Sequence, residues 1–330
     1  MAEYLPTIFL LLMGVAVLMY AVLDGFDLGI GMMLPADNRE HRDQMIASIG
    51  PFWDANETWL VLAVGILLIA FPAAHNLVLR ELYLPTAVML VALILRGVAF
   101  DFRAKAVTRY KATWDKVFQY GSLTASLAQG FMLGLYVCSF QWSLLTVGFS
   151  CLTAVGAAAA YRYIGGAWLV LKTTGELQQF AARKSRQAGW AMAVSFVAIC
   201  IVNPLLNPSV AERWFSMPGA LVVMLIPMMC GLIWIIVDQY LRYVPLKDDK
   251  ACWVPFLGAA AIFTLCLVGF AYSYYPYVIP NRITAEEAAS ATASLQFVFY
   301  GVVVVLPVIL AYTFLSYRIF KGKTTELNYY

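Results

Sequence analysis

Residues 6–33 read PTIFLLLMGVAVLMYAVLDGFDLGIGMM, and the first 18 of these positions carry no charge. About 20 consecutive apolar residues are enough for a helix to cross the hydrocarbon core of a bilayer. Similar runs recur along the rest of the chain, at about residues 51–73, 78–101, 116–139, 143–174, 186–206, 217–241, 252–276 and 292–320. The sequence therefore predicts an all-α polytopic membrane protein with about nine transmembrane helices.

The amino-acid composition supports the same class. Of the 330 residues, 62% are hydrophobic and 12% are charged, whereas an ordinary soluble domain carries about 25% charged residues. The long apolar runs also differ from the alternating pattern of an outer-membrane barrel strand. No connection between the spans is long enough for a separate soluble domain, so residues 1–330 are expected to form a single transmembrane domain. We expect no nucleic-acid partner.

Basic residues predict the orientation of the helices. The chain has 22 Lys and Arg residues, of which seventeen lie in the loops after odd-numbered spans and in the C-terminal tail. Loops after even-numbered spans hold only Arg80, Arg213 and Arg282, while Arg96 and Arg162 lie within spans. Because cytoplasmic loops carry the excess of Lys and Arg, the N-terminus is predicted outside and the C-terminus in the cytoplasm.

Two carboxylates lie inside the first span. Asp24 and Asp27 are three residues apart, so on a helix they point in nearly the same direction and can share a proton, a water chain or a cation. Gly25, Gly29 and Gly31 accompany them, and such small residues let a second helix approach closely. A carboxylate in hydrocarbon is costly unless it is paired, protonated or hydrated. We therefore favour proton handling at a subunit interface; the alternative is that the pair binds loop amides or an arginine.

Residues 50–59, GPFWDANETW, open the second span on the cytoplasmic side. Trp53, Asn56 and Glu57 share one helix face, and Asp54 lies on the neighbouring face. Asp54 is either part of a proton path or an acid that stabilises the first turn of the helix. Trp53 is either an anchor at the membrane interface or a flat wall for a quinone ring or a heme edge. Glu57 lies deeper in the span than Asp54, so stabilisation of the first helical turn explains it less well.

Arg96 lies inside the third span, and Asp101 follows at its cytoplasmic end. Arg96 can act as a counter-ion for Asp27 or Asp54, or for an acidic group such as a heme propionate. An arginine this close to a helix end can instead extend its side chain into water, and both interpretations remain open.

Ligands for a metal are scarce. The two histidines, His41 and His75, fall on opposite sides of the predicted membrane, so they cannot together ligate one heme. The six cysteines form no Cys-x-x-Cys pair. The sequence therefore predicts no metal site in this chain.

The two acidic stretches, Asp24–Gly31 and Pro51–Trp59, resemble the first and second helices of subunit II of cytochrome bd-type quinol oxidases. Arg96 within Leu-Arg-Gly-Val, and the stretch KTTGEL at 172–177, are similar to that family as well. Nine helices with an outer N-terminus is the family's topology, so the resemblance covers nearly the whole chain. It implies two four-helix bundles, at about 6–139 and about 143–276, and a peripheral ninth helix at about 292–320.

The resemblance also implies an activity, which is quinol oxidation (ubiquinol or menaquinol) coupled to reduction of oxygen to water in the bacterial cytoplasmic (inner) membrane. Two b-type hemes, heme d and the substrate-quinol site would belong to subunit I, the heme-bearing partner, so this chain would be heme-free and would hold no complete active site. A small single-helix subunit, membrane lipid and quinol are the other expected partners. The modest length of the chain suggests the cyanide-insensitive branch.

By matching position, Asp27, Asp54 and Arg96 would face subunit I and line a proton route from the cytoplasm, with Asp24, Glu57 and Asp101 beside them. Trp53, with Asn56 near it, would stand where some members hold a structural quinone. Glu57 departs from the pattern, since relatives carry an amide there.

Two other functions compete with this one. A proton- or cation-coupled secondary transporter would use Asp24, Asp27, Asp54 and Glu57 as its ion site, although the paired helix breaks typical of transporters are missing. A heme-carrying oxidoreductase would need His41 or His75 as a ligand.

Overall fold

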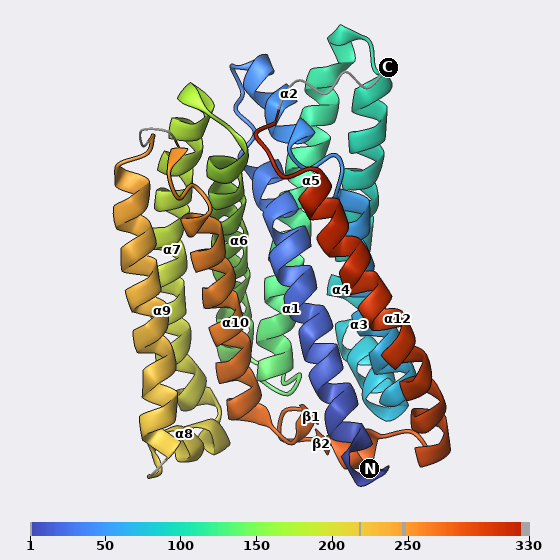
Figure 1. Ribbon diagram of the computed structural model, residues 1–330. Helices are drawn as coiled ribbons and strands as arrows, with labels where there is room; N and C mark the ends of the chain where they lie inside the picture. Colours follow the sequence, from blue (N-terminus) through green and yellow to red (C-terminus); the bar gives the residue numbers. More distant parts are fainter. Residues whose placement is uncertain (1, 218, 246–248, 325–330) are drawn as a thin grey trace.

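The computed structural model describes residues 2–217, 219–245 and 249–324, and these fold almost entirely into helices (Figure 1). Within these ranges nine helices have 18 or more residues: α1 (Leu5–Met32), α3 (Trp53–Ala70), α4 (Pro72–Lys105), α5 (Thr108–Val137), α6 (Leu144–Lys172), α7 (Gly175–Leu206), α9 (Gly219–Arg242), α10 (Val254–Tyr274) and α12 (Thr292–Ile319). The short elements are η1 (Ala2–Tyr4), α2 (Arg39–Ala47), α8 (Pro208–Phe215), β1 (Tyr277–Ile279), β2 (Ile283–Thr284) and α11 (Ala285–Ala288). The all-α fold class is confirmed.

Eight of these long helices are also apolar enough to span a membrane. The ninth, α5, carries more polar residues, but several of them lie inside the protein. Ser122 and Ser126 are fully buried, and their hydroxyls donate to the carbonyl oxygens of Phe118 (2.8 Å) and Ser122 (2.7 Å) in the preceding turn. Because the serines satisfy their hydrogen bonds within the helix, α5 can run through the middle of the bundle.

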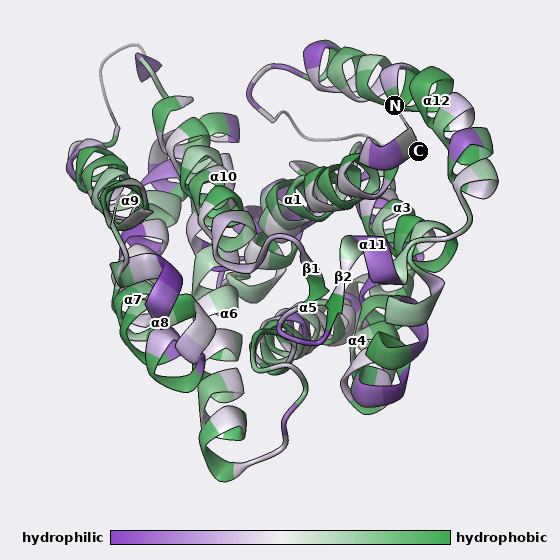
Figure 2. Cartoon of the chain, turned by 90° about the horizontal axis from the view of Figure 1, so that it is seen from below, coloured by the Kyte–Doolittle hydropathy of each residue, from purple (hydrophilic) through white to green (hydrophobic). Residues whose placement is uncertain are grey.

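The long helices form two groups of four. Helices α1, α3, α4 and α5 pack together, as do α6, α7, α9 and α10, and the groups meet where α6 contacts α1 and α5 (Figure 2). Helix α12 runs obliquely along the edge of the first group (Figure 1), and only Leu295 of its side chains is buried. This arrangement puts α1 at the centre of the molecule.

Most of the predicted spans agree with the helices to within a few residues. Three starts were predicted wrongly: α7 begins at Gly175 rather than 186, α5 at Thr108 rather than 116, and α4 at Pro72 rather than 78. The additional stretches of α7 and α5 carry several charged residues at the cytoplasmic end, where a helix can continue into water beyond the apolar core of the membrane.

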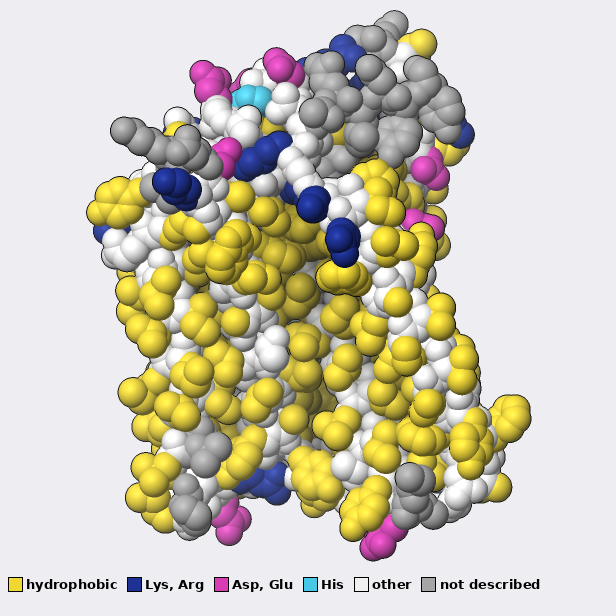
Figure 3. Space-filling model, viewed as in Figure 1, with side chains coloured by type: hydrophobic (Ala, Val, Ile, Leu, Met, Phe, Trp, Pro, Cys, Tyr) yellow, Lys and Arg dark blue, Asp and Glu magenta, His cyan; other side chains and the backbone are white. Residues whose placement is uncertain are grey.

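The first helix begins at one end of the bundle, and α12 ends at the opposite one (Figure 1). Thr324 N donates to Lys172 O (2.7 Å), so the described stretch after α12 rests on the end of α6. In Figure 3, most of the visible Lys and Arg side chains gather at this same end, above a broad apolar belt. The arrangement agrees with the predicted orientation; Lys247, one of the seventeen basic residues, lies outside the described residues.

Candidate functional site

The position of α1 is set by close backbone contacts. At Gly29 there is no room for a side chain, because a Cβ atom would overlap the carbonyl oxygen of Tyr161 on α6. Gly25 faces the ring of the same tyrosine, and Gly165 on α6 lies against the backbone of Gly29. Gly31 faces Ser122 on α5. The glycines therefore let α1 approach α6 and α5 closely beside Asp24 and Asp27.

Arg96 is the centre of a buried charged cluster. Its side chain is 1% exposed, and Nη2 donates to Asp24 Oδ1 (2.6 Å) and to Glu57 Oε1 (2.5 Å). The Asp24 side chain is fully buried, whereas that of Glu57 is 29% exposed. One guanidinium thus joins three helices, α1, α3 and α4, through two carboxylates of different exposure.

Asp27 has a different partner. Asn56 Nδ2 donates to Asp27 Oδ2 (2.8 Å) and to the carbonyl oxygen of Leu23 (3.3 Å). The hydroxyl of Tyr317 on α12 donates to Asn56 Oδ1 (3.0 Å), and its ring stacks on Phe52 with centroids 4.4 Å apart. Asn56 therefore connects the peripheral helix to a carboxylate on the central one.

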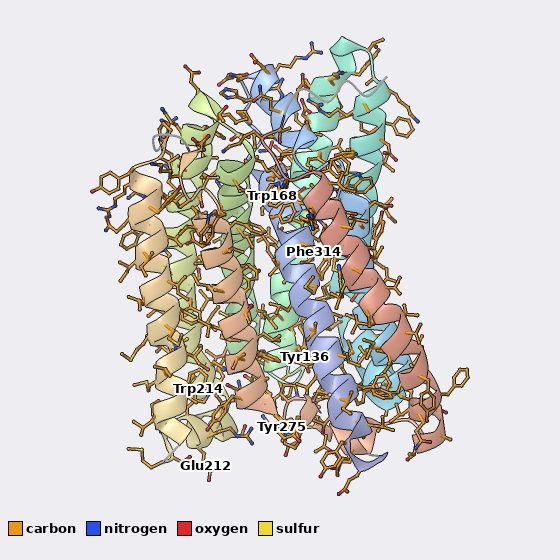
Figure 4. The ribbon with its side chains drawn as sticks, viewed as in Figure 1. Tyr136, Trp168, Glu212, Trp214, Tyr275 and Phe314 are labelled. Atoms are coloured by element: carbon orange, nitrogen blue, oxygen red, sulfur yellow. The ribbon has the colours of Figure 1, made fainter. Side chains whose placement is uncertain are left out.

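The aromatic surroundings continue onto α6. The ring of Phe26 stacks on Trp168 with centroids 4.3 Å apart, and Phe52 meets Trp168 edge-on. Figure 4 shows Trp168 near the cytoplasmic end of the bundle. Phe26 is completely buried and directly precedes Asp27 in the sequence. These rings therefore exclude lipid from one side of the acidic site.

Several buried atoms of the cluster keep free hydrogen-bonding capacity. Asp24 Oδ2, Asp27 Oδ1, and Nε and Nη1 of Arg96 are enclosed, and none has a hydrogen-bond partner among the described residues. Leaving such atoms unsatisfied in a low-dielectric interior is costly. The two carboxylate oxygens have room to accept a proton or a hydrogen bond, and the two guanidinium nitrogens have N–H groups left to donate. The geometry is suited to proton uptake and release.

The remaining predicted residues lie at the edge of this cluster. The side chains of Asp54 and Asp101 are exposed, and no ion pair joins either of them to Arg96 in the described structure. Trp53 is half-buried, with its ring 4.9 Å from that of Phe100. Arg96 therefore pairs with Asp24 and Glu57 rather than with Asp27 or Asp54, because α3 turns Glu57 inward and Asp54 outward. The arginine partner that the sequence left open for the pair on α1 is thus found for Asp24.

A second polar group was missed from the sequence. Gln129 Nε2 on α5 donates to Tyr20 Oη (2.6 Å), and Tyr161 Oη on α6 donates to Gln129 Oε1 (2.8 Å). Tyr20 lies one turn before Asp24 on α1, so these residues extend the polar interior toward the second group of helices. A glutamine inside an apolar span was the available signal.

An ion network at the cytoplasmic surface was also not predicted. Arg103 Nη2 donates to Asp43 (2.7 Å), and Arg103 also contacts Asp115, whose other oxygen lies 2.9 Å from Arg42. These side chains come from α2, α4 and α5 and hold the short helix α2 over the membrane-spanning bundle. The two histidines lie apart, His41 on α2 and His75 near the opposite end, at the start of α4.

Comparison with known proteins identifies relatives of the whole chain. The family described as cytochrome bd terminal oxidase subunit II matches residues 5–320. Cytochrome bd-I ubiquinol oxidase subunit 2 of Escherichia coli (strain K12) is 27% identical, over 98% of this chain and 96% of the relative. Cytochrome bd ubiquinol oxidase subunit 2 of Bacillus subtilis (strain 168) is also 27% identical, over 98% of this chain and 97% of the relative.

A solved structure has the same fold. The bd oxidase from Geobacillus thermodenitrificans contains a chain that superposes with a TM-score of 0.78 at 15% sequence identity, over 96% of this chain and 98% of that chain. Since the family match extends over almost every helix, from α1 to α12, the chain belongs to the cytochrome bd terminal oxidase subunit II family.

Proposed function

We propose that this chain supplies a scaffold and part of a cytoplasmic proton path to a heme-bearing partner, subunit I, in a quinol-oxidising terminal oxidase. Its family membership and long apolar helices make it a multi-pass subunit of an oxidoreductase complex in the bacterial inner membrane. Both curated relatives are named as subunits of ubiquinol oxidases. Reduction of oxygen to water consumes protons, so such a complex needs a route for them.

The observation that carries the proposal is the pair of buried acids on α1. Asp24 and Asp27 are 0% exposed, and each keeps one carboxylate oxygen without a hydrogen-bond partner in the described part of the chain. Asp27 lies five residues before the cytoplasmic end of α1 at Met32, which is roughly 8 Å along the helix. Uptake from that side would let oxygen reduction build a charge difference across the membrane.

The surface of α3 supports a partner subunit beside this path. Asp54, Thr58, Val61 and Leu68 follow one another at helical spacing and are all exposed, Val61 by 72%. An exposed carboxylate at the start of an apolar stripe is poorly suited to contact with lipid tails. We propose that subunit I covers this stripe.

The hemes of the complex, two of type b and one heme d, are proposed to lie in subunit I. We propose that a structural quinone stacks against Trp53 and Phe100, whose rings adjoin with centroids 4.9 Å apart. Asn56 is left out of that contact, because its amide is buried and already bonds Asp27 and Tyr317. A bound quinone would supply a redox-active ring there.

The family assignment gives the transporter alternative no support. The geometry is also unfavourable to a single ion site, because Asp54 is exposed and Asp27 accepts from Asn56. The carboxylates thus divide among different partners.

Replacement of the buried acids in the intact two-subunit complex tests the proposed path. Asp27→Asn and Asp24→Asn remove the proton acceptor with little change in volume, so oxygen consumption is expected to fall by about tenfold or more. Heme absorption measured on the same samples reports whether the complex has assembled. Glu212→Gln, an exposed acid on α8 at the opposite end (Figure 4), is the matched control. Normal turnover in both variants at normal heme content would refute the proposal.

A further inference from the structure

One nitrogen atom serves two acids in this cluster. Arg96 Nη2 lies 2.6 Å from Asp24 Oδ1 and 2.5 Å from Glu57 Oε1, while Nε and Nη1 have no partner among the residues described. Two oxygens bonded to the same nitrogen are close enough for a proton to pass between the carboxyl groups through at most one bridging water molecule. The arrangement therefore joins a buried acid to a partly exposed one.

The surrounding charges are mostly negative. Around Arg96 lie Asp24 and Asp27 from α1 and Glu57 from α3, and Asp54 lies near Glu57. The phenols of Tyr20 and Tyr161 face Asp24 from α1 and α6. One guanidinium cannot neutralise both of the carboxylates that it bonds, and like charges held this close favour keeping one proton between them.

We propose, building on the proton path proposed above, that Glu57 is the residue where a proton enters the cluster and that Arg96 directs it to Asp24. Glu57 first accepts a proton and becomes neutral, while Arg96 stays paired with the Asp24 carboxylate. The O–H bond at Glu57 then breaks and a new one forms at Asp24. Glu57 is again a carboxylate, now neutralised by Arg96, and no electrons are transferred.

The exposure of the two acids gives the step its direction. The Glu57 side chain is 29% exposed and that of Asp24 is fully buried. Both acceptor oxygens bond Arg96 Nη2, so the proton passes over a short distance from a partly exposed carboxyl group to a buried one. Asp27 is fully buried and hydrogen-bonded to Asn56, which leaves Glu57 as the partly exposed acid on Arg96.

Glu57→Gln in the intact complex separates proton entry from a purely structural role. The amide still offers an oxygen to Arg96 Nη2 but cannot accept a proton, so oxygen consumption should fall by about tenfold at unchanged heme absorption. Glu57→Asp, which keeps an acid, should restore a substantial part of the rate. Full activity of Glu57→Gln, or no recovery in Glu57→Asp, would overturn the inference. Glu212→Gln again serves as the control for loss of an acid elsewhere.

Infrared difference spectroscopy tests the exchange itself. If Glu57 and Asp24 share one proton, either Glu57→Gln or Asp24→Asn leaves Arg96 permanently paired with the remaining carboxylate. The same protonated-carboxyl band should therefore disappear in both variants, and its disappearance in only one, or in neither, contradicts a shared proton.

The two proposals can fail separately. If Asp24→Asn slows oxygen consumption and Glu57→Gln does not, entry through Glu57 is wrong and the proton path stands. If Asp24→Asn, Asp27→Asn and Glu57→Gln all leave oxygen consumption unchanged, both proposals are wrong.

Discussion

Arg96 stabilises the acids of the first helix by its charge as well as by its hydrogen bonds. The Arg96 side chain is 1% exposed and contacts the fully buried carboxylate of Asp24, so water solvates neither charge. Removing one partner of a buried ion pair leaves the other charge uncompensated, and this is much more destabilising than replacing both by apolar residues.

Arg96→Met is therefore expected to destabilise the folded chain by about 3–5 kcal/mol. The double variant Arg96→Met/Asp24→Leu removes both members of the pair and should recover part of this loss. Thermal unfolding of the purified complex in detergent, compared with its heme content, measures both effects. An Arg96→Met protein as stable as the unmodified one would show that the ion pair contributes nothing to the fold.

The residues of the acidic site could be found from the sequence, but their pairing could not. Composition and spacing single out Asp24, Asp27, Glu57 and Arg96, because charged residues are rare inside apolar spans. Which acid meets Arg96 depends on the rotation of α3 and α1 about their axes. Successive helix residues are rotated by about 100°, so Asp54 and Glu57, three positions apart, point only about 60° away from each other. A small rotation of α3 therefore decides which of them points inward, and only the packed structure supplies that rotation.

Small residues determine how the helices themselves meet. The contact between α1 and α6 depends on backbone approaching backbone at Gly29 and Gly165. In lipid, where burial of apolar groups adds little to helix association, close packing of this kind is the main attractive contribution.

Gly29→Ala should force α1 and α6 apart and lower stability by about 1–3 kcal/mol, as overpacking does in other tightly packed interiors. The same substitution at Gly148 on α6, where an added Cβ meets nothing within 4 Å, should be nearly neutral. Both variants can be compared by thermal unfolding and by oxygen consumption of the complex. Equal effects at the two positions would contradict the role assigned to Gly29.

Helix boundaries at the cytoplasmic end were the least predictable elements. Hydropathy detects only the part of a helix that lies in the membrane, so the charged start of α7 at Gly175 was missed. The group formed by Tyr20, Gln129 and Tyr161 was missed as well, since its members come from three helices far apart in the sequence.

For the whole molecule, the distribution of basic residues and the packing of the helices agree on one orientation. Helix α2 lies at the cytoplasmic end, and α8 lies at the opposite end (Figure 1). Helix α2 exposes Glu40, and α8 exposes Glu212.

Cysteine labelling tests this orientation. A membrane-impermeant maleimide added to spheroplasts should label the cysteine of the Glu212→Cys variant. It should label the cysteine of the Glu40→Cys variant only after the membrane is permeabilised. The unsubstituted protein controls for its own six cysteines. The reverse pattern would invert the topology and put the acidic site at the wrong side for cytoplasmic protons.

Arg96, the ion-pair partner of Asp24, is synthesised well after it. Arg96 follows it by 72 positions in the chain, which a ribosome working at about 5–20 residues per second needs roughly 4–14 s to synthesise. During that interval the first helix has already left the ribosome with acids that are expensive to place in lipid. It has to stay beside the insertion machinery, or enter the bilayer with its carboxyl groups protonated, until α4 arrives. The rate of translation between these two helices therefore sets how long α1 must wait for its ion-pair partner.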